Sequence, residues 1–200
     1  GTSVTATATA NDGYSFVNWT NADNQEVSKE SSYKFDLADE TALTANFKIN
    51  KYPVVFINDG VEVQKGDLDF ASAITAPENP IKAGYTFLGW YNGETKFVEG
   101  AIVPVDGVTY TAKWQINQYT ITFDTKGGNE IAPITLDYNT EITKPADPTK
   151  EGYSFAGWDK EIPSNMPAEN MTITASWTVN QYKVTFKNGD DVVASDEFDY

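Results

Sequence analysis

The chain has 200 residues, a formal net charge of −15, 14% aromatic residues, and neither cysteine nor histidine. This acidic charge repels phosphate backbones and anionic membranes, so we expect no nucleic-acid partner. Without histidine or cysteine, Ser-His-Asp and Cys-His catalysis are excluded and the commonest zinc ligands are missing. No apolar run approaches the roughly 20 residues of a membrane-spanning helix, so no membrane insertion is expected. The many β-favouring and aromatic residues instead predict a packed, mainly β protein.

Residues 1–49 contain the first copies of two sequence blocks that recur along the chain. An aromatic block, Gly-Tyr-Ser-Phe-Val-Asn-Trp, lies at 13–19, and a closing block, Leu-Thr-Ala-Asn-Phe, lies at 43–47. In later copies both blocks come after an opening block, which this segment lacks. We therefore expect residues 1–49 to be a divergent repeat whose first hairpin is missing.

Residues 50–117 contain all three blocks. The opening block, Lys-Tyr-Pro-Val-Val-Phe, is followed by Asn58-Asp-Gly60, which predicts a hairpin turn and a second strand near 61–70. The next segment, Pro77-Glu-Asn-Pro80, cannot form a central strand. The aromatic block at 84–90, a variable loop and the closing block Tyr-Thr-Ala-Lys-Trp114 complete the unit.

Residues 118–180 repeat this order, and residues 181–200 begin it again. The opening block at 118–123 alternates Tyr, Ile and Phe with Thr, which is strand periodicity. The aromatic block recurs 68 residues after its previous copy, from Trp90 to Trp158. The last 20 residues contain an opening block and the turn Asn188-Gly-Asp190, so we expect them to form the opening hairpin of a further repeat.

These motifs resemble the internalin-type B-repeat, also called the Listeria–Bacteroides repeat. The matching features are the Tyr-x-Val/Ile-x-Phe opening, the Pro-x-Lys-x-Gly-Tyr-x-Phe-x-Gly-Trp centre at 80–90 and 148–158, and the Thr-Ala-x-Trp close. Residues 1–48 resemble the second half of a divergent relative. The resemblance implies β-grasp-like (α+β, mainly β) modules, strung as an elongated array in secreted or wall-attached adhesive bacterial proteins.

The recurring aromatic residues are interpreted as a structural repeat core, because each recurs at one position of the repeat. This predicted core comprises Tyr14, Phe16, Trp19, Phe47, Phe56, Tyr85, Phe87, Trp90, Trp114, Phe123, Tyr153, Phe155, Trp158, Trp177 and Phe186. Gly89, Gly157 and Asn18 stand directly before a tryptophan, which predicts a β-bulge or a positive φ there. The alternative for the tryptophans is a sugar-stacking platform.

Some residues outside the repeat pattern are also candidates for binding. Tyr33, Tyr91 and Phe97 lie outside the recurring positions and could make exposed contacts. Two oxygen-rich segments, at 21–24 and 188–191, carry residues that calcium favours, but Asn, Asp and Gly are also ordinary turn residues. We interpret both segments as turns, with no metal site and no cofactor.

The sequence predicts a non-catalytic spacer, stalk or weakly adhesive segment of a bacterial cell-surface or secreted protein. Its partners would be a host or cell-wall protein or a glycan. The alternative is a carbohydrate-binding module attached to a secreted glycoside hydrolase. The linkers Gln115–Gln118 and Thr178–Gln181 contain no Gly, Ser or Pro, so we expect stiff junctions into which Ile116 and Val179 pack.

The two ends are expected to expose strand edges. We predict that 182–186 or 192–200 pairs with the preceding unit, or head-to-tail with the edge near Thr2–Ala10 of a second copy.

Overall fold

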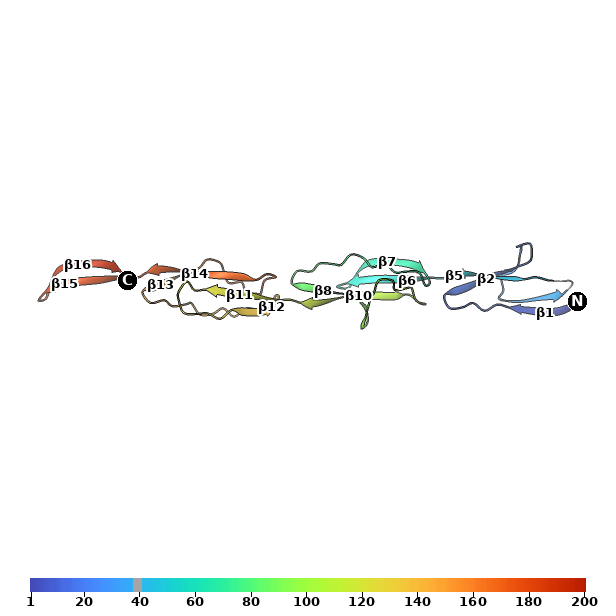
Figure 1. Cartoon of the computed structure of the whole chain (residues 1–200), viewed down its shortest axis with the longest axis horizontal. Coiled ribbons are helices and arrows are strands. Elements are labelled where there is room, and N and C mark those ends of the chain that lie inside the picture. Colours follow the sequence, from blue (N-terminus) through green and yellow to red (C-terminus); the bar gives the residue numbers. More distant parts are fainter. Residues whose placement is uncertain (38–40) are drawn as a thin grey trace. The chain divides into compact units, whose positions relative to one another are not determined.

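The computed structural model describes residues 1–37 and 41–200. All regular structure in these residues is β-strand, as Figure 1 shows, which confirms the mainly β prediction. The helical component of an α+β fold is absent from the described part, where no helix is long and apolar enough to cross a membrane. The chain divides into two compact units, residues 1–80 with 87–114 and residues 81–86 with 115–200.

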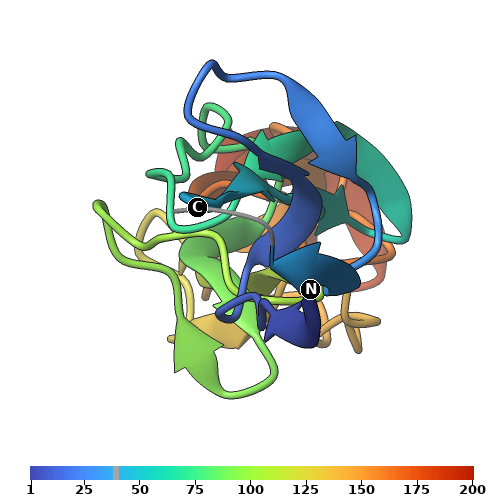
Figure 2. The same cartoon turned by 90° about the vertical axis from the view of Figure 1, so that its right-hand side faces the viewer.

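The N-terminal repeat consists of two small antiparallel sheets. Its strands are β1 (Thr2–Thr7), β2 (Tyr14–Thr20), β3 (Glu26–Ser28), β4 (Ser32–Leu37) and β5 (Thr44–Ile49). β1 pairs with β4, with Val4 opposite Phe35, whereas β2 lies between β3 and β5. The turn between β2 and β3 projects at the top of Figure 2. The predicted free edge at Thr2–Ala10 is therefore partly occupied, because β4 takes one side of β1.

The second repeat is a five-stranded mixed sheet in the order β7-β6-β10-β8-β9. Its strands are β6 (Lys51–Asn58), β7 (Val61–Asp69), β8 (Tyr85–Asn92), β9 (Thr95–Lys96) and β10 (Val108–Ile116). The turn residues Asp59 and Gly60 have φ angles of 47° and 81°, as a two-residue type I′ turn requires. β6 runs antiparallel to β7 and parallel to β10, so the opening and closing blocks lie side by side.

The third repeat forms a four-stranded sheet in the corresponding order, β12-β11-β14-β13. Its strands are β11 (Gln118–Asp124), β12 (Ile134–Asp137), β13 (Tyr153–Trp158) and β14 (Met171–Val179). Here too the opening strand β11 runs parallel to the closing strand β14. The second strand of the hairpin, β12, has 4 residues where β7 has 9, and the proline-rich connector at 145–148 lies outside the strands.

A short ladder outside the sheet closes the core of each of these two repeats. In the second repeat, Ala73 bridges Ile102, and the neighbouring Ile74 and Val103 are 1% and 0% exposed. In the third repeat, Glu141 bridges Asn165 next to the buried Ile142 and Met166. These ladders come from the connectors and variable loops, for which the sequence predicted no strand.

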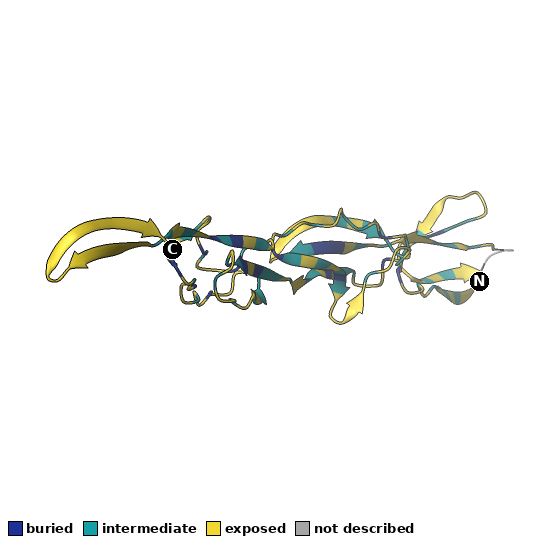
Figure 3. Ribbon diagram, turned by 60° about the vertical axis from the view of Figure 1, so that its left-hand side comes forward, coloured by how far each residue is buried: buried dark blue, intermediate teal, exposed yellow. Residues whose placement is uncertain are grey.

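The C-terminal residues form a hairpin of β15 (Gln181–Asn188) and β16 (Asp191–Asp199). All of its residues are exposed, which makes it uniformly yellow in Figure 3. Within the described chain its sheet contains these two strands alone, so the predicted sheet pairing with the preceding unit is wrong. The hairpin is linked to that unit at its base, where Tyr200 N–H donates to the Asn180 carbonyl at 3.0 Å.

Candidate functional site at the repeat junctions

A single asparagine separates the last strand of each repeat from the first strand of the next. Asn50 lies between β5 and β6, Asn117 between β10 and β11, and Asn180 between β14 and β15. The linkers are thus shorter than the four residues expected from the sequence, because the flanking strands extend into them. Ile116 is 37% exposed and Val179 is half-buried. The prediction that both side chains pack into the junction is therefore wrong for Ile116.

Each of these asparagines makes three hydrogen bonds that connect the two repeats. Asn117 N–H donates to the Gly84 carbonyl at 2.9 Å, and the Asn117 carbonyl accepts from Tyr138 N–H at 2.8 Å. The Thr86 hydroxyl donates to Asn117 Oδ1 at 2.7 Å. The same three bonds recur at the other junctions, with Asn50 bonded to Gly13, Phe70 and Ser15, and Asn180 bonded to Gly152, Tyr200 and Ser154.

An aromatic ring from the following hairpin covers the buried glycine at each junction. Gly84 has a φ of 76°, and a Cβ added there would overlap the ring of Tyr138. That ring also meets Tyr85 edge-on, with the centroids 6.0 Å apart. Phe70 covers Gly13 and Tyr200 covers Gly152 in the same way. Glycine is therefore required twice over, by the left-handed backbone and by the ring packed against it.

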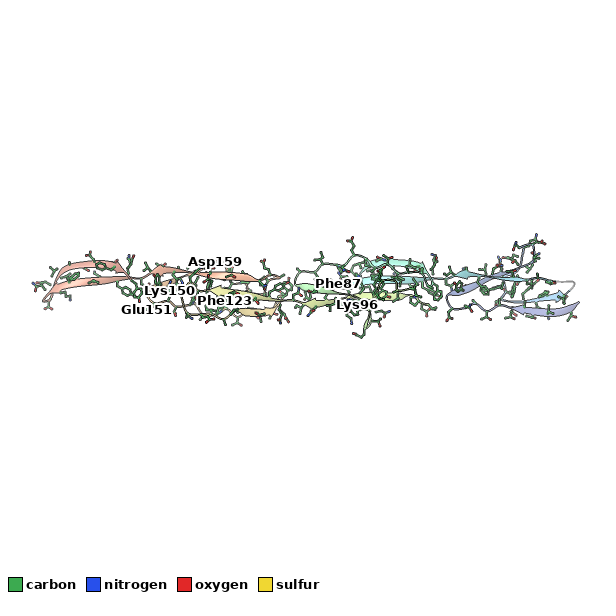
Figure 4. The ribbon with its side chains drawn as sticks, in the orientation of Figure 1. Phe87, Lys96, Phe123, Lys150, Glu151 and Asp159 are labelled. Carbon is green, nitrogen blue, oxygen red and sulfur yellow. The ribbon has the colours of Figure 1, made fainter. Side chains whose placement is uncertain are left out.

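The lysine of the Pro-x-Lys-x-Gly-Tyr motif also acts at the junction. Lys82 Nζ lies 4.6 Å from the centroid of the Tyr85 ring, and Lys150 Nζ lies 4.3 Å from that of Tyr153. In both copies the tyrosine N–H donates to the lysine carbonyl at 3.1 Å. Figure 4 labels Lys150 and its neighbour Glu151 near the base of the terminal hairpin. The motif thus forms the turn that presents the junction glycine.

A polar contact closes the base of each opening hairpin. At the first junction Lys51 Nζ lies 3.0 Å from Asp69 Oδ1. In the next two hairpins a glutamine replaces the lysine, and its Nε2 donates to Asp137 at 2.9 Å or to Asp199 at 3.0 Å. At the last junction, the Tyr200 hydroxyl forms a hydrogen bond with the Glu151 carboxylate. This hydrogen bond and the negative charge of Glu151 raise the pKa of Tyr200 above its ordinary value of 10.0.

The predicted core residues occupy three different environments. Buried are Trp19, Phe56, Trp90 and Phe123; half-buried are Phe16, Tyr85, Phe87, Trp114, Tyr153, Phe155, Trp158 and Trp177; exposed are Tyr14, Phe47 and Phe186. The exposed residues lie at a junction or on segments that lack half of a repeat. Gly89 and Gly157 have φ angles of 135° and 125°, and the β2 register shifts at Asn18 without a positive φ.

Neighbouring groups fix the orientation of most tryptophan side chains. The indole N–H of Trp19 donates to the Glu30 carbonyl at 3.1 Å, and that of Trp177 donates to the Thr125 carbonyl at 2.9 Å. Trp90 is 3% exposed and packs edge-on against Phe56 at a centroid distance of 5.2 Å. These rings are part of the packing, and Trp90 offers no open face on which a sugar could stack.

The other candidate contacts are half-buried and packed. Tyr33 stacks on Phe35 at 5.3 Å, Tyr91 lies under the Lys113 ammonium at 4.7 Å, and Phe97 contacts the buried Phe56.

The oxygen-rich segments provide no evident metal centre. Asn21 Oδ1 accepts hydrogen bonds from the Asp23 and Gln25 N–H groups, so this side chain closes its own turn. In the part of the chain that the structure describes, no three acidic side chains come together where they could hold a metal ion. In the second segment, β15 ends at Asn188 and β16 begins at Asp191, so the residues between them form the turn of the terminal hairpin.

The contacts at the junctions were not predicted from the sequence, although a recurring sequence pattern marks them. Asn50, Asn117 and Asn180 occupy the same position directly before each opening block. An aromatic residue follows each asparagine after 20, 21 and 20 residues, at Phe70, Tyr138 and Tyr200. The contact crosses the boundary between repeats, so comparing repeats with one another did not reveal it.

Comparison with known proteins assigns the repeats to a family. Residues 52–113 and 119–179 match the Listeria-Bacteroides repeat domain, and residues 1–51 match the divergent InlB B-repeat domain. A protein of Evansella cellulosilytica named "Putative membrane protein" is 34% identical over 195 residues, which cover 90% of this chain and 29% of that protein. Internalin H of Listeria monocytogenes is 34% identical over 142 residues, or 64% of this chain and 25% of its own length. This chain thus spans less than a third of either relative, and it belongs to the Listeria-Bacteroides repeat domain family, with a divergent InlB B-repeat domain at its N-terminus.

Proposed function

We propose that this chain is a non-catalytic spacer segment of a bacterial surface-associated protein, in which the junctions couple consecutive repeats mechanically. The observation that carries the proposal is the threefold recurrence of the Asn–Gly–aromatic junction. A spacer needs each unit to hold its neighbour in a defined orientation, and a single connecting asparagine with three hydrogen bonds restricts that freedom.

Coupling also supports the stability of the individual units. A repeat of about 65 residues buries only about 60% of its unfolded surface and is marginally stable alone. In repeat arrays, contacts between neighbours supply part of the stability. Tyr138 belongs to the third repeat, yet it packs on Gly84 of the second, so neither repeat has its full set of contacts without the other.

We further propose that the modules are 50–117 and 118–180, with a partial unit at either end, and that they are β-grasp-like. The support is the sheet order, in which the first and last strands of each repeat lie parallel in the middle. In a β-grasp fold a helix crosses between the two hairpins. Here the connector from Ser72 to Lys82 contains only an isolated bridge and takes the place of that helix.

Weak adhesion is a second candidate, favoured by one observation. Grooves of about 480 Å³ and 380 Å³ lie beside Trp90 and Trp158, at corresponding positions of two repeats. Each is lined by a proline of the connector, by at least one lysine and by at least one acidic side chain, such as Pro77, Lys96 and Glu99 in the second repeat. Recurring shallow sites could act together on a repeating glycan.

The test places the chain between a wall anchor and a reporter domain on a bacterial surface. Large antibody-coated beads should reach the reporter through the native chain, and much less well when Asn50, Asn117 and Asn180 are all replaced by glycine. The matched control replaces three exposed asparagines outside the junctions, Asn79, Asn92 and Asn188, by glycine. Equal bead binding by the junction variant would contradict a spacer role. Glycan-array binding that is lost on Lys96→Ala would favour adhesion.

A further inference from the structure

The variable loop of the second repeat exposes three aliphatic side chains: Val98 is 66%, Ile102 is 58% and Val105 is 41% exposed. Ile102 bridges Ala73, which is exposed as well. The residue that follows each of these two in the chain is buried in the core, so the pair lies on the outward face of the ladder. The loop turns back beside the ladder, where Ala101 N–H donates to the Val98 carbonyl at 3.1 Å. We refer to Ala73, Val98, Ile102 and Val105 as the outer patch.

Packing within the repeat does not account for the outer patch. In the third repeat the same bridge joins Glu141 and Asn165, which are both exposed. Asn165 follows Ile102 by 63 residues, and the same offset places the exposed Glu161 at the position of Val98. A closely related sheet thus forms with polar side chains at three of the four positions. Single exposed aliphatic residues are ordinary, but a group of them marks a surface that interacts.

The segments that carry the outer patch have charges of one sign. Residues 70–81 and 97–109 contain no lysine and three acidic residues, Glu78, Glu99 and Asp106. The corresponding segments of the third repeat, 138–149 and 160–172, contain four acidic residues and two lysines. Protein interfaces have an apolar centre and a polar rim, and the charges of the two rims are complementary. The partner that fits the outer patch therefore has aliphatic side chains flanked by cations.

Two lysines adjoin these segments in the sequence but make contacts elsewhere. Lys82 lies over the ring of Tyr85, and the side chain of Lys96 lies against Gly89 of β8. The acidic character of the segments also disfavours two other occupants. In a pair of chains joined through the outer patch, like charges would face each other, and an anionic membrane would repel the same carboxylates.

We propose that the outer patch is a docking site for a protein partner whose binding segment has aliphatic side chains flanked by lysine or arginine. The apolar centre supplies the affinity, and the acidic side chains attract and orient the basic flanks. Four aliphatic side chains make a small contact, so the binding is weak and falls as added salt screens the charges. The second repeat has this combination and the third does not. This inference does not depend on the proposed function as a spacer.

Selection of a library of random linear peptides on the immobilised full chain tests the proposal. The enriched peptides should combine aliphatic residues with lysine or arginine. Val98→Glu together with Ile102→Asn should weaken their binding about tenfold or more. The third repeat has these residues at the corresponding positions, so the fold accommodates them. Val61→Glu is the matched control: it adds the same charge at an exposed aliphatic residue outside the outer patch and should leave the affinity nearly unchanged.

A second variant, Glu78→Lys with Glu99→Lys, keeps the apolar centre and should also weaken the basic peptides, most strongly at low salt. Unchanged binding by this variant overturns the assignment of a basic partner. A library that yields no such peptides, or peptides that bind equally well after Val98→Glu with Ile102→Asn, overturns the docking site. So does self-association of the native chain, or its binding to phosphatidylcholine vesicles, if that double substitution abolishes it, because the patch then serves a second copy or a membrane.

Discussion

Replacing Gly84 by alanine should uncouple the second junction at a predictable cost. Alanine in the left-handed region costs about 1–2 kcal/mol, which applies to the φ of 76° at Gly84. The added Cβ also displaces the Tyr138 ring, and losing that half-buried ring and its edge contact with Tyr85 costs about 2 kcal/mol more. We therefore expect a local loss of about 3–4 kcal/mol. Gly60→Ala is the matched control, because Gly60 has a φ of 81° and nothing within 4 Å of an added Cβ.

Native-state hydrogen exchange is the suitable assay, because an array of units does not unfold in one step. Protection of the β11 and β12 amides reports opening of this junction. In a double-mutant cycle, Tyr138→Ala removes the ring, and Gly84→Ala should then cost only its backbone part. The two substitutions should fall short of additivity by about 2 kcal/mol. Additive effects, or equal losses for Gly84→Ala and Gly60→Ala, would refute the ring-on-glycine contact.

Three further outcomes follow from the same structure. Asn117→Ala should reduce β11 protection by about 1 kcal/mol, and Asn117→Asp by less because it keeps the acceptor; equal effects would contradict a role for the side-chain oxygen. In chemical denaturation Phe56→Ala, at a fully buried site, should cost about 3–5 kcal/mol and the half-buried Phe155→Ala clearly less, and the reverse order would contradict the assigned cores. Because the pKa of Tyr200 is raised in the folded chain, the stability that its hydrogen bond to Glu151 contributes should be fully present below the unfolded pKa near 10 and be lost as pH rises through the folded pKa; Glu151→Gln should lower the pKa in an ultraviolet titration, and an unchanged pKa would exclude that hydrogen bond.

The recurrent blocks predicted the strands of the opening hairpins, the aromatic blocks and the closing blocks, whereas β1, β3, β4 and β9 lie outside the blocks and were not predicted. Tyr119–Phe123 alternates as a strand should, the turn at Asp59-Gly60 marks a hairpin, and the prolines at 77 and 80 exclude a strand, all as observed. These are local preferences of the backbone, which short stretches of sequence report directly.

The features that the sequence did not predict depend on contacts between distant segments. The ladder around Ile74 and Val103 arises from two irregular segments that meet only in the folded repeat. The contact between Gly84 and Tyr138 joins residues that are 54 positions apart and belong to two different repeats of the sequence. Gly89 was singled out in the sequence because it precedes a tryptophan. Gly84, on which the Tyr138 ring packs, has the sequence context of an ordinary turn residue.

Spin-label distance measurement across the first junction tests the central claim most directly. The chain has no cysteine, so Lys34→Cys in β4 and Lys65→Cys in β7 introduce two exposed labels, one on each side of Asn50. If the junction couples the repeats, the labels should give one narrow distance distribution that broadens on Asn50→Gly. A broad distribution for the native junction, unchanged by Asn50→Gly, would contradict the account.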